Sequence, residues 1–106
     1  MSSEDRDHPV LPDAWQYQII GVRLELVPED VQKPYLDLAL IRNGERRTLR
    51  FWSPQELEIE QGGPVSGVLK ILDVTGRQLA GLRVRVDDFE AARGSLRFWA
   101  RDVAPI

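Results

Sequence analysis

The sequence predicts an all-β protein: a single-domain antiparallel β-sandwich or flattened barrel of about seven strands, with one short helix near residues 88–93. Three observations lead to this fold class. Most of the chain alternates apolar and polar residues with the period of two that half-buried strands show. Asn43 and Gly44 form a tight-turn signal between two such runs. Only one short segment, near residues 88–93, is interpreted as a helix.

The length of the chain fits one domain. Its 106 residues are enough for a single core, and 42% hydrophobic with 29% charged residues is near the average of globular proteins. Residues 1–14 mix charge, proline and serine without any periodicity, so we expect them to form a flexible N-terminal arm. Residues 15–106 are expected to form the single β domain.

The first strand is predicted after Gln16, where apolar residues alternate with polar ones. We expect four apolar side chains on its buried face: Ile20, Val22, Leu24 and Leu26. Gly21 interrupts the pattern and is expected to mark a β-bulge. The following segment, VPEDVQKPY, contains two prolines and is interpreted as a connection.

The most specific prediction is a hairpin over residues 35–52, because Asn43 and Gly44 suit the positive φ angles of a type I′ turn. A two-residue turn determines the register of both strands. The predicted cross-strand pairs are Arg42 with Glu45, Leu40 with Arg47, Leu38 with Leu49, Asp37 with Arg50, Leu36 with Phe51, and Tyr35 with Trp52.

The second half of the chain is predicted to contain four further strands. Residues 53–64 are ambiguous, because residues 53–56 have the form of a helical capping box while Leu57 and Ile59 alternate with glutamates; we favour a brief turn followed by a strand. Residues 68–74 are apolar on both faces, as in a central strand. Residues 82–86 alternate cleanly. Asp87 is interpreted as the cap of the short helix near residues 88–93, and residues 95–103 as the final strand.

The tripeptide RFW occurs twice, at residues 50–52 and 97–99. In the first copy the hairpin register supplies Asp37 opposite Arg50, so cross-strand pairing explains the motif. In the second copy we expect Arg83 or Arg85 to lie opposite Arg97 or Arg101, which places like charges together. These arginines therefore require a source of negative charge.

Two sources are considered for the second copy. A neighbouring strand with Glu56, Glu58 and Glu60 would form an internal ladder, with Trp99 stacked under a guanidinium. Alternatively, a partner with acidic or phosphate groups would bind this face and use Trp99 as an anchor. We favour the internal ladder, and the order of the strands decides between the two.

Catalytic and cofactor motifs are sparse in this sequence. There is no cysteine, and the single histidine, His8, lies in the expected arm, so we predict neither a catalytic triad nor a disulfide. Two acidic clusters could contact a metal but are interpreted as solvated or capping residues: Asp5 and Asp7 beside His8, and Asp87 and Asp88 with Glu90. No phosphate-binding glycine motif occurs. We therefore expect no enzyme activity, cofactor or metal.

The functional hypothesis is a non-enzymatic protein-interaction module, of the adaptor or immunity type, in a cytoplasmic protein. Its expected partner-binding surface consists of Arg83, Arg85, Arg97, Trp99 and Arg101. The partner is predicted to be another protein or a second copy of the chain. A nucleic-acid-binding domain and a small-molecule-binding barrel are the alternatives, although a net charge of −3 argues against nucleic acid. No apolar run is long enough for a membrane helix.

Overall fold

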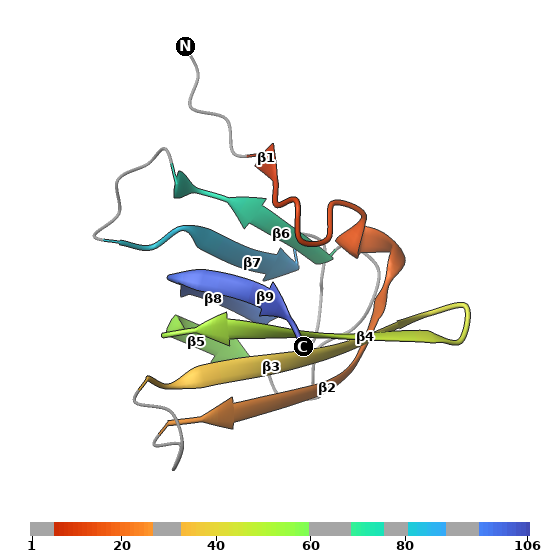
Figure 1. Cartoon of the computed structure of the whole chain (residues 1–106), viewed down its shortest axis with the longest axis horizontal. Helices are drawn as coiled ribbons and strands as arrows, with labels where there is room; N and C mark the ends of the chain where they lie inside the picture. Colours follow the sequence, from red (N-terminus) through yellow and green to blue (C-terminus); the bar gives the residue numbers. More distant parts are fainter. Residues whose placement is uncertain (1–5, 27–32, 60–68, 76–80, 89–95) are drawn as a thin grey trace.

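The computed structural model describes residues 6–26, 33–59, 69–75, 81–88 and 96–106, which form an all-β sandwich of two antiparallel sheets (Figure 1). The first sheet has the order β1-β6-β7-β8-β5, with strands Arg6–Asp7, Leu69–Asp73, Val84–Asp88, Leu96–Ala100 and Gln55–Ile59. The second has the order β2-β3-β4-β9, with strands Gln18–Glu25, Tyr35–Arg42, Glu45–Trp52 and Asp102–Pro105. The predicted sandwich is confirmed. Within the described ranges, no helix has the length and apolar character needed to cross a membrane.

The predicted hairpin over residues 35–52 is confirmed as β3 and β4, with every expected cross-strand pair in place. Asn43 and Gly44 have φ angles of 51° and 81°, the positive values that a type I′ turn requires. This register places Leu36, Leu38 and Leu40 on the inner face of the sheet, where each is fully buried.

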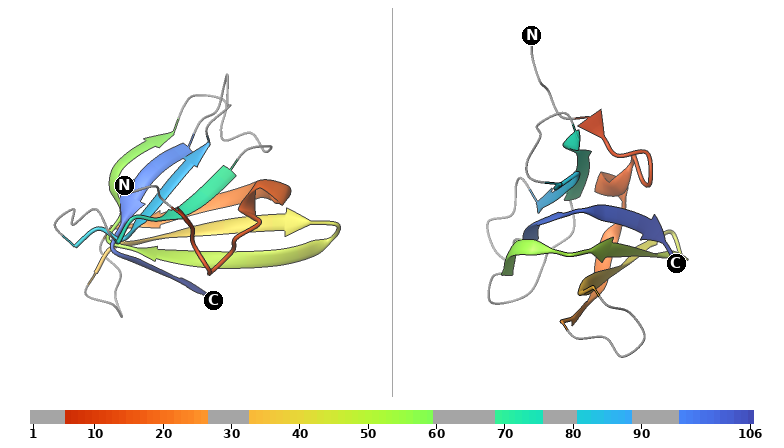
Figure 2. Two further views of the ribbon diagram at one scale, coloured as in Figure 1. Left: turned by 90° about the horizontal axis from the view of Figure 1, so that it is seen from above. Right: turned by 60° about the vertical axis from the view of Figure 1, so that its left-hand side comes forward.

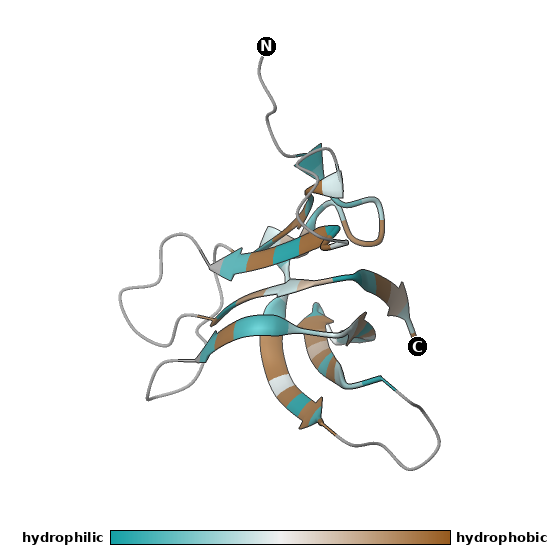
Figure 3. Ribbon diagram, turned by 90° about the vertical axis from the view of Figure 1, so that its left-hand side faces the viewer, coloured by the Kyte–Doolittle hydropathy of each residue, from teal (hydrophilic) through white to brown (hydrophobic). Residues whose placement is uncertain are grey.

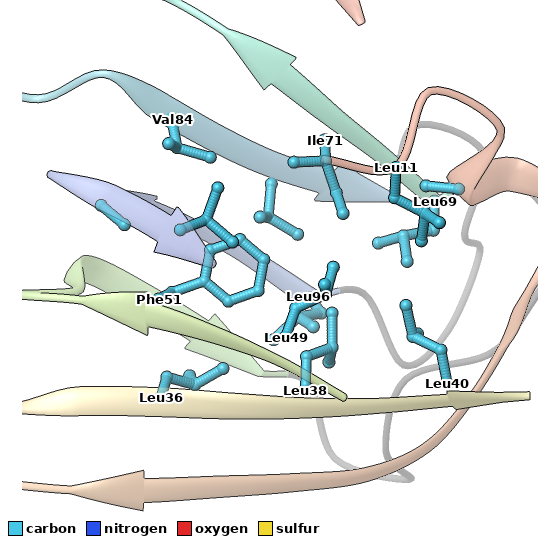
Figure 4. Packing of buried hydrophobic residues seen from close by; sticks show 14 of the residues in the cluster. Leu11, Leu36, Leu38, Leu40, Leu49, Phe51, Leu69, Ile71, Val84 and Leu96 are labelled. Atoms are coloured by element: carbon cyan, nitrogen blue, oxygen red, sulfur yellow. The ribbon is translucent and has the colours of Figure 1, made fainter. Parts of the chain in front are cut away.

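The core lies between the sheets and is built from the inner faces of their strands (Figure 4). Phe51 of β4 and Phe98 of β8 meet there edge to face, with their ring centroids 5.0 Å apart. The alternation of hydrophobic and hydrophilic residues that produces these inner faces is visible along the strands in Figure 3. The two RFW copies therefore contribute one phenylalanine each to the contact that joins the sheets.

The chain changes sheets between β1 and β2, and again at two points that neighbour each other. It leaves β4 for β5 after Trp52, and it leaves β8 for β9 at Arg101. The predicted strand over residues 95–103 is therefore two strands, one in each sheet. Because β4 pairs with β9 and β5 pairs with β8, the two switching segments run side by side. In the left view of Figure 2 the sheets come together at this end of the molecule and diverge at the other.

Strand β2 contains the expected bulge, but its position changes which residues are buried. The register with β3 shifts between Ile19 and Gly21, so Ile20 is the inserted residue. Ile19 is buried and Ile20 is 46% exposed. The prediction that Ile20 lies on the buried face was wrong, because the bulge moves that position to Ile19.

Residues 6–14 are not separate from the domain, which differs from the expected arm over residues 1–14. Arg6 and Asp7 form β1 and pair with β6, and the side chains of Leu11 and Ala14 are buried in the core. A short 3-10 turn, η1 (Ala14–Gln16), leads into β2. Residues 1–5 lie outside the described residues.

The short helix expected near residues 88–93 falls largely outside the described residues. The part that is described, Asp88, lies at the end of β7 and is therefore in a strand. Asp87, interpreted as the helix cap, is also a residue of β7 and pairs with Lys70 and Arg97 of the flanking strands. The expected central position of residues 68–74 is confirmed, since β6 lies between β1 and β7.

The turn that determines the hairpin register provides a test of this fold. Gly44 has open space around it, so Gly44→Ala should cost only the strain of a positive φ, about 1 kcal/mol of unfolding free energy in urea denaturation. Gly21→Ala is the matched control, because its new Cβ would make an ordinary 3.6 Å contact with Ala39 and its φ is not positive. Equal effects of the two substitutions would contradict the turn assignment.

Candidate functional site

The five residues of the expected partner surface lie at two places: Arg85, Arg97 and Trp99 in the β7–β8 ladder, and Arg83 and Arg101 just beyond its last pair. The β7–β8 register pairs Arg85 with Trp99 and Asp87 with Arg97. Arg83 and Arg101 both lie directly beyond the last pair, Val84 with Ala100, so the expectation that Arg83 or Arg85 faces Arg97 or Arg101 is not contradicted for them, but it was wrong for Arg85 and Arg97. A carboxylate and an aromatic ring, not a second arginine, lie across from them.

Asp87 is the group that balances these two arginines. Its side chain is only 6% exposed, and its carboxylate accepts a hydrogen bond from Arg85 at 2.9 Å. The Nε atom of Arg97 approaches the other carboxylate oxygen at 3.5 Å. The guanidinium of Arg85 also lies over the ring of Trp99, 4.7 Å from its centroid. A buried carboxylate between two guanidinium groups is thus neutralised where it sits.

The expected glutamate ladder is present only in part. β5 does lie beside β8, and Glu58 is opposite Arg97, with 4.0 Å between the charged groups. The register shifts between Gln55 and Glu58, and Glu56 has a φ of 53° within this irregular stretch. Glu60 lies outside the described residues. The internal charge balance therefore depends mainly on Asp87 and only weakly on Glu58.

A hollow of about 510 Å³ lies over this network. Its lining residues are Glu56, Leu57, Glu58, Arg85, Arg97, Phe98 and Trp99. Both signs of charge are represented, and the two arginines already have carboxylate partners. This hollow therefore offers little unpaired charge to a ligand.

The other two arginines lie at the end of the sandwich where the strands change sheets. We call this second space the corner hollow; its volume is about 550 Å³. It is lined by Lys33, Trp52, Ser53, Gly81, Arg83, Arg101 and Asp102. Three cationic groups and one carboxylate line it, and that carboxylate accepts a hydrogen bond from the Val103 N–H at 2.9 Å. The corner hollow is therefore predominantly cationic.

Backbone hydrogen bonds hold the walls of the corner hollow in place. The N–H of Arg101 donates to the carbonyl of Trp52 at 2.9 Å, and the N–H of Arg83 donates to the carbonyl of Ala100 at 3.0 Å. Ser53 adopts a φ of 52°, which turns the chain out of β4, and its N–H donates to the carbonyl of Pro34 at 2.8 Å. The side chains project from a fixed main chain.

Arg83 and Arg101 differ from the other arginines of this face in their polar contacts. Among the residues that the structure describes, neither guanidinium has a hydrogen bond or ion pair, and the same is true of the ammonium group of Lys33. All three side chains are exposed. The corner hollow therefore brings together cationic groups that the fold leaves available.

The arginine of the first RFW copy, Arg50, is paired with a carboxylate, as predicted. Arg50 donates two hydrogen bonds to Asp37, at 2.8 and 2.9 Å, and its guanidinium lies 3.8 Å from the centroid of the Tyr35 ring. The hydrogen bonds to Asp37 raise the pKa of Arg50 above its ordinary value. The rings of Tyr35 and Trp52 pack edge to face, 5.6 Å apart. This contact orients Trp52, which also lines the corner hollow.

His8 directly follows β1 and is partly buried. Its Nδ1 atom accepts a hydrogen bond from the Val10 N–H at 3.0 Å. Burial lowers the pKa of His8 below its ordinary value, although the carboxylates of Asp73 and Asp102 act in the opposite direction. Hydrogen bonds from Thr75 lower the pKa of Asp73. In the described part of the chain, no three acidic or histidine side chains are grouped to hold a metal ion.

Comparisons with known proteins do not connect this site to a family. No protein-family model, curated protein or solved structure matches the chain.

Sequence reasoning missed two parts of this arrangement. Asp87 follows Arg83 and Arg85 at the same spacing of two residues, and this spacing predicts that all three share one face of a strand. Asp87 was instead interpreted as a helix cap, because it comes directly before the expected helix. Lys33 and Trp52 come from distant parts of the chain, and only the change of sheet at the corner brings them beside Arg101.

The role of Asp87 can be tested by removing its charge while keeping its shape. Asp87→Asn should lower the unfolding free energy by about 1–3 kcal/mol, because two arginines lose a buried partner while remaining partly exposed themselves. Glu58→Gln is the matched control in the same network and should change it by less than about 0.5 kcal/mol, since that pair is exposed. Urea denaturation measures both. A larger loss of unfolding free energy in Glu58→Gln than in Asp87→Asn would contradict the assignment of Asp87 as the main carboxylate partner of these arginines.

Proposed function

We propose that this protein is a non-enzymatic interaction module that binds an acidic segment of a partner protein in the corner hollow. The observation that carries the proposal is the convergence there of Arg83 and Arg101, which have no side-chain polar partner among the described residues. An adaptor or immunity-type protein would use such a site to hold its partner.

The chemistry of the corner hollow suits carboxylate groups presented by a peptide. Arginine presents a planar fork of donors that matches a carboxylate with two hydrogen bonds. Trp52 supplies an aromatic surface beside these donors, and aromatic residues with arginines are typical anchors of protein interfaces. Lys33 adds a third positive charge to the lining. An acidic segment that also carries an apolar side chain would use all of these groups.

The distribution of charge favours a protein partner over a nucleic acid. Affinity for nucleic acids comes largely from many phosphate contacts along a basic surface. Here Arg50, Arg85 and Arg97 are paired with carboxylates of the chain itself. The net charge of the whole chain is −3, so a long polyanion would also meet repulsion away from the corner. A few anionic groups fit the available cations better than a polynucleotide does.

The proposal is tested with a fluorescein-labelled peptide rich in glutamate and aspartate that also carries aromatic residues, by fluorescence anisotropy. The combined substitution Arg83→Ala and Arg101→Ala should weaken binding at least about tenfold, because both guanidinium contacts are lost. The control, Arg6→Ala with Arg46→Ala, removes the same charge from exposed positions outside the corner hollow and should leave binding within about twofold.

Two further measurements separate this proposal from its alternatives. Arg97→Ala with Trp99→Ala changes the other hollow and should have little effect on peptide binding. Labelled single-stranded RNA should bind more weakly than the peptide at the same ionic strength. An equal loss of peptide affinity in the control variant, or tighter binding of RNA, would refute the proposed function.

A further inference from the structure

The strand β2 forms one edge of the four-stranded sheet, where it is the lowest strand in Figure 1. Among the described residues it pairs with β3 alone. Alternate residues of this eight-residue strand therefore direct their N–H and C=O groups away from β3, which is the feature that allows a sheet to add a further strand. Natural edge strands of this length are normally covered or blocked.

The inner side of β2 is apolar and incompletely covered. Val22 pairs with Leu38 and Leu24 pairs with Leu36, and both β3 partners are fully buried. On β2 itself, Leu24 is 38% exposed, and Leu26, just after the strand, is 67% exposed. The core therefore covers the first part of β2, at Ile19 and Val22, and leaves Leu24 and Leu26 partly exposed. This leaves an apolar overhang beside an edge that can form hydrogen bonds.

The outer side of β2 carries one charge of each sign. The guanidinium of Arg23 donates to the carboxylate of Glu25 at 2.8 and 3.0 Å, and both groups remain accessible at the surface. The two residues are separated by Leu24. A strand with this pattern is complementary to an antiparallel copy of itself, because turning it about Leu24 exchanges the positions of the positive and negative residues.

We infer that the chain forms a symmetric dimer in which the β2 strands of two copies pair antiparallel about Leu24. Leu24 then faces Leu24 of the other copy, Val22 faces Leu26, and each Arg23 faces a Glu25. This arrangement joins the two four-stranded sheets and places one apolar overhang against the other. The inference is independent of the proposed function, since it uses neither Arg83 nor Arg101.

The neighbouring registers are less favourable for reasons that are visible in the strand. Pairing about Arg23 places the two Arg23 side chains directly opposite each other, and like charges in this position are destabilising. Pairing about Val22 places Glu25 against Ile19, where the bulge has changed the alternation of faces. Only the register about Leu24 combines opposite charges on the outer face with apolar contacts on the inner face.

The test uses charge reversal at the two outer positions, with the oligomeric state measured by sedimentation velocity and native mass spectrometry. The unmodified chain should be a dimer. Arg23→Glu alone and Glu25→Arg alone should each weaken self-association at least about tenfold, because each places like charges opposite one another. An equimolar mixture of these two variants should form a heterodimer, since each reversed residue then meets an opposite charge.

Two controls address folding and nonspecific charge effects. Arg46→Glu reverses the charge of an exposed arginine of β4, as Arg23→Glu does in β2, and should leave the dimer intact. Circular dichroism checks that each variant retains its strand content. A monomeric unmodified chain at high micromolar concentration would overturn the inference. So would a mixture that fails to associate, or single variants that dimerise as well as the unmodified chain. None of these results depends on peptide binding at the corner hollow.

Discussion

The hydrogen bond from the Arg101 N–H to the Trp52 carbonyl joins two neighbouring points at which the chain changes sheets, from β4 to β5 and from β8 to β9. On one side of it, β4 pairs with β9, and on the other, β5 pairs with β8. Phe51 and Phe98, which lie shortly before these two points in the chain, are in contact in the core. Because both strands turn at this point, side chains from several segments surround the corner hollow. The core contact and the candidate binding site thus both depend on this pair of neighbouring sheet changes.

The distribution of charge around this crossing follows a single pattern. The arginine of each RFW copy lies opposite an aspartate on the neighbouring strand, Asp37 for Arg50 and Asp87 for Arg97. The paired guanidinium groups are therefore part of the structure of the outer faces, where they satisfy carboxylates that are largely removed from water. Arg83 and Arg101 do not follow this pattern. Their guanidinium groups have no carboxylate partner among the described residues, because both arginines lie at the corner, beyond the last pair of the β7–β8 ladder.

Local patterns were enough to predict an all-β sandwich or flattened barrel. They also predicted the complete β3–β4 register, because a two-residue turn determines every pair that follows it. They failed where the answer depended on contacts distant in sequence. Ile20 became exposed because the bulge precedes Gly21 by one residue, and Asp87 appeared to be a cap although β7 extends through it. The corner hollow could not be predicted from the sequence, since Lys33 and Arg101 meet only through the order of the strands.

The most direct test of the central claim is to observe the arginine and tryptophan side chains by NMR while an acidic peptide is added. Signals from the Nε–H groups of Arg83 and Arg101 and from the Trp52 indole N–H should shift together and saturate. Those of Arg85 and Arg97 should stay in place, because Asp87 already holds them. Shifts confined to Arg97 and Trp99, or no saturable shift at the corner hollow, would contradict the account.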